Sequence, residues 1–171
     1  EVQQDFKDAR AASFYRYLVP AFTDLYGGDF ETMTPEQARQ LNDRIFENDK
    51  SDKWLNHVVT ERANIELMLI DPYWARFKFD RPYRFSVPVL NVTTMVDGFH
   101  PSSFTSSLDS PYDFAKQNGK EVKTLDDYLA AIDMVFQKAV ASDAICLKTT
   151  LAYQRTLDFQ NVSKERAEKA F

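Results

Sequence analysis

The sequence predicts an α/β protein whose first part is helical and whose second part is a partial TIM-like (β/α) barrel. Helical periodicity with clear cap signals fills the chain up to about residue 64. Short apolar runs without polar alternation follow, which is the pattern of strands buried on both faces of a parallel sheet. Connections from helix to strand are very short and those from strand to helix are long, as in a (β/α) barrel. We therefore expect a helical insert or subdomain over residues 1–64 and a barrel segment over residues 65–171.

The helical part contains three predicted helices. Residues 5–26 carry apolar side chains at a rough 3.6-residue spacing and predict a helix that Pro20 should kink or split. Residues 34–37 combine a threonine cap, a proline at the first helical position and a glutamine that completes a capping box. They predict a helix that runs to about Asn48. The third helix should begin at residue 51 or 52.

Three apolar runs predict the strands. The first run is Glu66–Asp71, the second is Phe85–Val96, and the third is Ala144–Thr150. All three are expected to be buried. Pro88 cannot donate a backbone hydrogen bond, so it should lie at an edge, at a bulge or at the start of its strand.

A long loop and a strongly marked helix separate the second and third strands. Residues 97–123 are rich in Ser, Pro, Asp and Gly and predict a loop, with a short helix near residues 112–117. Thr124 and Asp127 form a capping pattern that starts a long helix ending near Ser142. Its predicted buried stripe consists of Leu125, Leu129, Ile132, Val135, Phe136 and Val140.

The end of the chain predicts a piece of a longer protein. Ser163 is a good cap for a helix over Lys164–Phe171, and the apolar residues of that helix only begin a buried face. A full (β/α)8 barrel takes about 250 residues. The sequence has material for three strands, so we expect either a fragment of a barrel or a small open sheet.

Composition excludes several classes of protein. The chain has 171 residues with a formal net charge of −5, which argues against a general nucleic-acid binder. Its many aromatic residues argue against disorder, and its single cysteine, Cys146, excludes an internal disulfide framework. No apolar run approaches the length of a membrane span. We expect a cytoplasmic protein with no membrane or nucleic-acid partner.

Candidate site residues lie mainly after the predicted strands. Lys148 ends an otherwise apolar strand, where a lysine either reaches solvent or faces a catalytic mouth. Asp71 ends the first strand and either shares that mouth or caps the turn at Pro72. Asn91, in the second strand, carries the same ambiguity. His100 follows the second strand as either a turn residue or a functional one.

A basic and aromatic stretch follows the first strand. Residues 73–84 interleave aromatic side chains with Arg76, Lys78, Arg81 and Arg84. The stretch predicts either a clamp for an anionic ligand or a base, or a loop packed by its aromatics and solvated by its cations. Nucleotide-binding glycine loops and the serine-hydrolase elbow are missing from the sequence.

The last part of the chain resembles the amidohydrolase superfamily. The phrase Leu-Lys-x-x-x-Ala-Tyr-x-Arg-x-Leu over residues 147–157 carries most of this resemblance, together with residues 124–129 and 136–139. Residues 63–71 are similar to a helix end and the second strand of that barrel, and residues 5–48 are similar to a helical insert of some members. More narrowly, the chain resembles the amidohydrolase-2 group, whose relatives include domains fused to glutamine synthetase.

The resemblance implies a segment of a metal-dependent hydrolase that acts on C–N or C–O bonds through a metal-activated water. The predicted strands are then barrel strands 2 to 4. Lys148 matches a position that carries a carbamylated bridging metal ligand in many members. Tyr153 and Arg155 are then substrate-binding residues, and Arg76, His100 and Asp71 join them as candidates.

The same resemblance sets the expected cofactor and partners. A divalent metal, with zinc as the first choice, is expected in the full-length protein. None is expected for this chain alone, because its sequence has no His-x-His pair. The expected partners are a small-molecule substrate and, as a homo-oligomer, further copies of the chain. The alternative function is a non-catalytic binding or scaffold module that retains part of the barrel.

Overall fold

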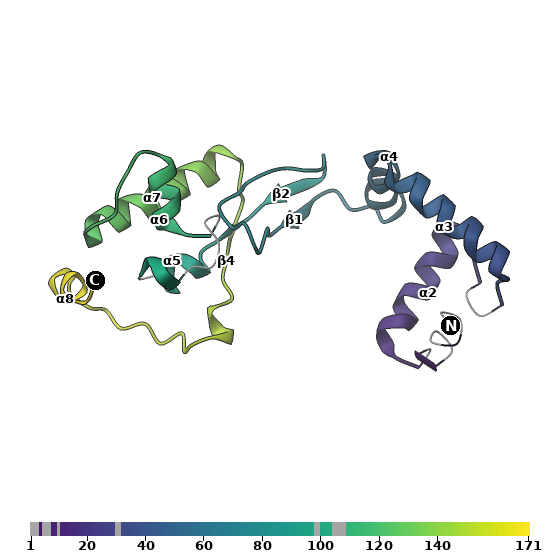
Figure 1. The fold of residues 1–171 in the computed structure, drawn as a ribbon, viewed down its shortest axis with the longest axis horizontal. Helices are drawn as coiled ribbons and strands as arrows, with labels where there is room; N and C mark the ends of the chain where they lie inside the picture. The colour runs from purple at the N-terminus through teal and green to yellow at the C-terminus, as the bar shows by residue number, and fades with distance from the viewer. Residues whose placement is uncertain (1–3, 5–7, 10, 30–31, 98–99, 104–108) are drawn as a thin grey trace. The chain divides into compact units, whose positions relative to one another are not determined.

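The protein is a mixed α/β chain that divides into two compact units, Glu1–Ala63 and Asn64–Phe171. A computed structural model describes residues 4, 8–9, 11–29, 32–97, 100–103 and 109–171 (Figure 1). Within this described part, no helix is both long enough and apolar enough to cross a lipid bilayer.

The first unit is helical. Helix α2 spans Ser13–Tyr26 and contains Pro20, so the proline does not split it. Gly27 ends the helix with a left-handed backbone (φ 69°), and its N–H donates to the carbonyl of Thr23. The prediction that this helix begins at residue 5 falls partly on residues 5–7 and 10, which lie outside the described residues.

Two further helical segments complete the first unit. Helix α3 spans Pro35–Asp49 and begins with the predicted Thr34–Gln37 capping box. Helix α4 spans Asp52–Asn56 and continues directly into η1, a π-helix over His57–Arg62. The predicted start of the third helix is thus confirmed, but the sequence did not predict that it continues as a π-helix.

The second unit contains short parallel strands. Strand β1 (Met68–Ile70) pairs with β2 (Ser86–Pro88), and β3 (Leu90–Asn91) pairs with β4 (Leu147–Lys148). Both pairings are parallel, as the sequence predicts. Figure 1 shows β1 and β2 side by side.

Strands β2 and β3 belong to one continuous segment that hydrogen-bonds on both sides. Val89 N–H donates to the carbonyl of Ile70 at 3.1 Å, whereas Leu90 N–H donates to the carbonyl of Cys146 at 3.0 Å. Pro88 is the last residue of β2, where it is in register with Ile70, and is not at the start of that strand. Its carbonyl accepts from Ile145 N–H at 3.3 Å on the other side, where the paired residues begin only at Leu90.

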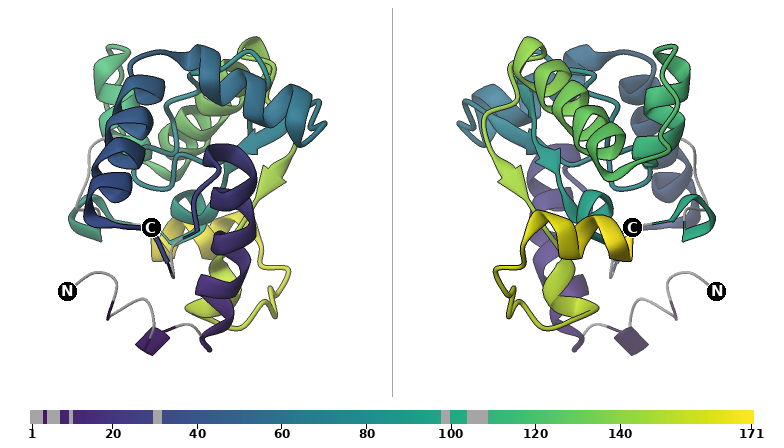
Figure 2. Two further views of the ribbon diagram at one scale, coloured as in Figure 1. Left: turned by 90° about the vertical axis from the view of Figure 1, so that its right-hand side faces the viewer. Right: turned by 90° about the vertical axis from the view of Figure 1, so that its left-hand side faces the viewer.

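Helices and short 3₁₀ turns connect and follow the strands. They are α5 (Thr93–Asp97), η2 (Pro101–Ser103), α6 (Pro111–Gln117), α7 (Leu125–Ala141), η3 (Leu151–Tyr153) and α8 (Lys164–Ala170). Helices α6 and α7 pack side by side (Figure 2). The predicted capping box of α7, the Ser163 cap of α8 and the short helix α6 are confirmed. Part of the predicted loop, residues 98–99 and 104–108, lies outside the described residues.

The hydrophobic core of the second unit lies between the middle strand segment and the helices. Its buried members are Phe77, Phe79, Leu90, Met95, Phe114, Val135 and Ala139. The aromatic rings of Phe77 and Phe114 meet edge to face with centroids 5.9 Å apart, which joins the loop after β1 to α6.

The prediction that all three strands are buried is wrong for the outer two. The middle segment is buried throughout, but Leu69 in β1 is 56% exposed and Leu147 in β4 is 60% exposed. Within the part of the chain that the structure describes, each of these strands pairs with one neighbour, and both side chains stay open to solvent.

The predicted buried stripe of α7 is also partly wrong. Val135 is fully buried, but Leu129 and Val140 are exposed. The fully buried residues of the helix are Tyr128, Ala131, Val135 and Ala139, and the predicted Ile132 and Phe136 are partly buried and pack against the same core. Leu129 and Val140 lie on the side of the helix that faces solvent.

Two matched substitutions on α7 test this helix orientation. We expect Val135→Ala to lower the free energy of unfolding by about 2 kcal/mol, because it removes buried methyl groups and leaves a cavity. Val140→Ala, the control at a 72% exposed position of the same helix, should change it by less than about 0.5 kcal/mol. Urea denaturation measures both, and equal losses would show that the assigned orientation is incorrect.

Candidate functional site at the carboxyl edge of the strands

Polar side chains from all the strand ends gather at one place in the second unit. We call this group the carboxyl edge, and it consists of Asp71, Asn91, Thr93, Lys148 and Thr150. Asp71 follows β1, Asn91 ends β3 and Lys148 ends β4. Parallel strands place their carboxyl ends at the same edge of a sheet, which is why residues so distant in sequence meet.

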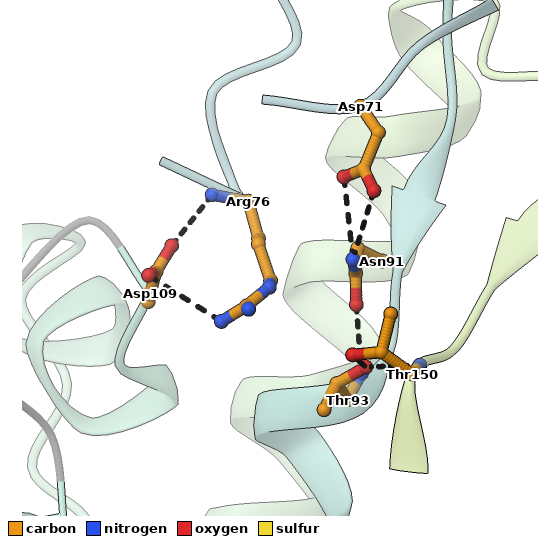
Figure 3. A network of polar contacts seen from close by, with 6 residues as sticks. All are labelled: Asp71, Arg76, Asn91, Thr93, Asp109 and Thr150. Carbon is orange, nitrogen blue, oxygen red and sulfur yellow. Dashed lines mark hydrogen bonds and ion pairs between the residues drawn. The ribbon is translucent and has the colours of Figure 1, made fainter. Parts of the chain in front are cut away.

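Asn91 fixes the carboxylate of Asp71. Its Nδ2 lies 3.2 Å from Oδ1 and 3.1 Å from Oδ2 of Asp71, and its Oδ1 accepts from the backbone N–H of Thr93 at 3.1 Å (Figure 3). Asn91 is fully buried. Because both ends of its amide are engaged, the side chain has one satisfied orientation and holds Asp71 in place.

Lys148 pairs with the carboxylate that Asn91 holds. Its Nζ lies 2.8 Å from Asp71 Oδ2, and its side chain is 50% exposed, whereas that of Asp71 is 13% exposed. The hydrogen bond to Asp71 and the charge of that carboxylate raise the pKa of Lys148 above its ordinary value. The structure thus joins two residues that the sequence placed at strand ends, with a shared mouth as one of the two alternatives for Asp71. The turn at Pro72 is closed by a backbone contact, in which Asp71 O accepts from Tyr73 N–H at 2.8 Å.

Hydroxyl groups extend the carboxyl edge beyond the charged pair. The Oγ1 of Thr93 accepts from Thr150 N–H at 2.9 Å and lies 3.2 Å from the hydroxyl of Thr150 (Figure 3). These contacts join the residues that follow β3 to those that follow β4. Sequence reasoning missed Thr93 and Thr150, although hydroxyl residues near the ends of two apolar runs were the signal that could have found them.

Arg76 is buried against Asp109 and is not exposed as a clamp. The backbone N–H of Arg76 donates to Asp109 Oδ1 at 2.6 Å, and its Nη1 lies 3.5 Å from Oδ2 (Figure 3). Its guanidinium also lies over the Tyr73 ring, 4.3 Å from the centroid. This pair therefore ties the loop after β1 to the segment before α6.

The other described ion pairs of the basic stretch also use carboxylates of the chain itself as partners. Lys78 Nζ lies 2.8 Å from Asp80, and Arg81 Nη1 lies 3.5 Å from Asp143. Arg81 Nε also donates to the carbonyl of Ser86 at 3.0 Å. These contacts favour the interpretation of a packed, solvated loop over that of an anion clamp.

The remaining candidates lie outside the polar network. His100 Nδ1 is 2.8 Å from the hydroxyl of Ser102, a contact two residues along the chain. Arg155 lies over the ring of Phe159, 4.9 Å from its centroid. Tyr153 is almost fully exposed on η3, and its phenol contributes to the raised pKa of Lys148. Of the predicted substrate-binding residues, Asp71 is the one that a described contact joins to Lys148.

The carboxyl edge does not fit the divalent metal that the resemblance implies. Among the described residues, no group of three or more His, Cys, Asp or Glu side chains is placed to hold a metal ion. At the edge itself the donor set is one carboxylate, already paired with an ammonium group and an amide. A structural or catalytic zinc site needs three or four such protein ligands.

Comparisons with known proteins identify no relative. No protein-family model matches the chain, no curated protein matches its sequence, and no solved structure matches it.

Removing Asp109 should test the buried ion pair. We expect Asp109→Ala to lower the free energy of unfolding by about 3–5 kcal/mol, because Arg76 is left as an unpaired buried charge. The control is Asp143→Asn, which removes the charge of an exposed partner of Arg81, suits the left-handed backbone at this position (φ 57°) and should cost less than about 1 kcal/mol. Chemical denaturation measures both variants, and a small loss for Asp109→Ala would contradict the assigned role.

Replacing Asp71 should test the cause of the Lys148 shift. A raised folded-state pKa means that the pair stabilises the fold below the ordinary lysine pKa of about 10.4. This stabilisation is lost as the pH rises through the higher folded-state pKa. We expect Asp71→Asn to lower the pKa of Lys148 toward the ordinary value, measured by NMR titration of the lysine Cε signals. The pKa of Lys164, paired with Asp126 at 2.7 Å, should stay raised. An unchanged Lys148 titration would exclude Asp71 as the cause.

Proposed function

We propose that residues 65–171 are a segment of an amidohydrolase-like (β/α) barrel, and that the protein hydrolyses C–N or C–O bonds of a small molecule. In this proposal β1, the β2–β3 segment and β4 correspond to barrel strands 2 to 4. The carboxyl edge contributes to the active site, and residues 1–64 are a helical insert. The proposed compartment is the cytoplasm.

One observation carries the proposal. Parallel strands that follow one another in sequence lie next to one another, and they bring Asp71, Asn91 and Lys148 to a single edge. In (β/α) barrels the catalytic residues stand at this end of the strands. The motif resemblance centres on residues 147–157, which include Lys148 itself.

The residues of this chain supply binding and orientation in the proposed reaction. Lys148 presents an ammonium group to a carbonyl or carboxylate oxygen of the substrate, and Asp71 holds that ammonium in place. Asn91 fixes Asp71 from the buried side. Any zinc ion that the resemblance implies would be held by residues other than those described, and it would supply an activated water.

Hydrolysis by the complete gene product that contains these residues tests the proposal. Purified protein is incubated with a panel of small amides and esters, and products are quantified by mass spectrometry. We expect hydrolysis of at least one class, and a loss in kcat/KM of about 100-fold or more in Lys148→Met and Asp71→Asn.

The matched control is Lys164→Met. Lys164 forms an exposed ion pair of similar length, 2.7 Å, with Asp126 in the first turn of α7, and it lies 3.6 Å from Glu168 on its own helix. It should leave kcat/KM unchanged. Absence of hydrolysis across the panel, or full activity in Lys148→Met, would reject the proposal and favour the non-catalytic binding module.

A further inference from the structure

We infer that Lys148 acts as an ammonium group that binds a carboxylate of an organic acid, and that it is not converted to a carbamate. The inference deepens the proposed function and rests on it, because it names the substrate class of the same site. It assigns Lys148 a different role from the bridging metal ligand that the motif resemblance implies.

The two charges of the pair are unequally exposed. Asp71 is turned inward, with 13% of its side chain exposed, whereas half of the Lys148 side chain is exposed. The inward carboxylate is already in contact with the Asn91 amide through both oxygens. A ligand that approaches the carboxyl edge therefore meets the cation first, although the chain as a whole is acidic.

Lys148 has hydrogen-bonding capacity left for a ligand. An ammonium group has three N–H donors. Among the described residues, the one contact recorded for Nζ is that with Asp71. Asp71 is the larger cause of the raised pKa of Lys148, and the exposed phenols of Tyr73 and Tyr153 contribute to it. The remaining N–H donors of the ammonium group suit the oxygens of a carboxylate.

The fixed carboxylate opposes carbamate formation. Carbamylation forms a bond between Nζ and the carbon of CO₂ as one C–O π bond of CO₂ opens, and two of the three ammonium protons are released to solvent. The product is an anion at the position where Asp71 now holds a cation. Asp71 is locked by the fully buried Asn91 and cannot turn away. A carbamate on Lys148 and the carboxylate of Asp71 would repel each other, because no cation lies between them.

NMR of the 171-residue chain with isotopically labelled lysine tests ligand binding. Lys148 is assigned from the signal that Lys148→Arg removes, and Lys164 serves as the internal control with a similar ion pair and similar exposure. Acetate is the probe, acetamide is its neutral counterpart, and sodium chloride controls for ionic strength. We expect acetate to shift the Lys148 signal saturably, with no comparable shift at Lys164 and none with acetamide.

Two results would overturn the inference. The first is an acetate response at Lys148 no larger than that at Lys164 or than that with chloride. The second is a carbamate carbon signal in ¹³C-bicarbonate that is present in the natural chain and lost in Lys148→Arg. If Lys148→Arg fails to fold, the Asp71→Asn chain provides the second comparison, and its acetate response at Lys148 should persist.

These outcomes separate the inference from the proposed function. Acetate binding at Lys148 without hydrolysis by the complete gene product would reject the hydrolase and keep the ligand class. Hydrolysis together with a Lys148 carbamate would keep the hydrolase and reject the ligand class.

Discussion

The two-sided hydrogen bonding of residues 86–91 is the constraint on which the second unit depends. This buried segment holds β1 on one side and β4 on the other through alternate backbone groups. Leu90 from the same segment enters the core formed with Phe114 and Val135. A change in its register would exchange its two faces and separate Asp71 from Asn91. The site therefore depends on the same backbone contacts that build the sheet.

Buried polar contacts then convert this scaffold into a defined edge. The Arg76–Asp109 pair ties down the loop after β1, and the Asn91 amide fixes the first residue of that loop, Asp71. Both contacts involve groups that are costly to leave unpaired in a low-dielectric interior. Such contacts give a rigid geometry on the protein side, and they leave the half-exposed Lys148 as the group that faces solvent.

The outer strands show the cost of building a parallel sheet from few strands. Leu69 and Leu147 carry apolar side chains typical of strands buried on two faces, yet both are exposed. Val140 on α7 is another apolar side chain that is exposed. Open strand edges with apolar neighbours favour association in solution. Experiments on the isolated chain therefore need low protein concentration and a check of its oligomeric state.

The sequence by itself determined the local structure, because its signals act within a few residues. The capping boxes at Thr34 and Thr124 set where α3 and α7 begin, and the apolar runs set the parallel strands. Tertiary structure decided the rest. Which face of α7 is buried depends on what the helix packs against. Ala131 and Ala139 are buried in the structure, whereas Leu129 is exposed. The sequence could place Asp71 and Lys148 at strand ends, but only strand order and register brought them within 2.8 Å. Likewise, the basic stretch could not show that Arg76 is buried, because its partner Asp109 is distant in sequence.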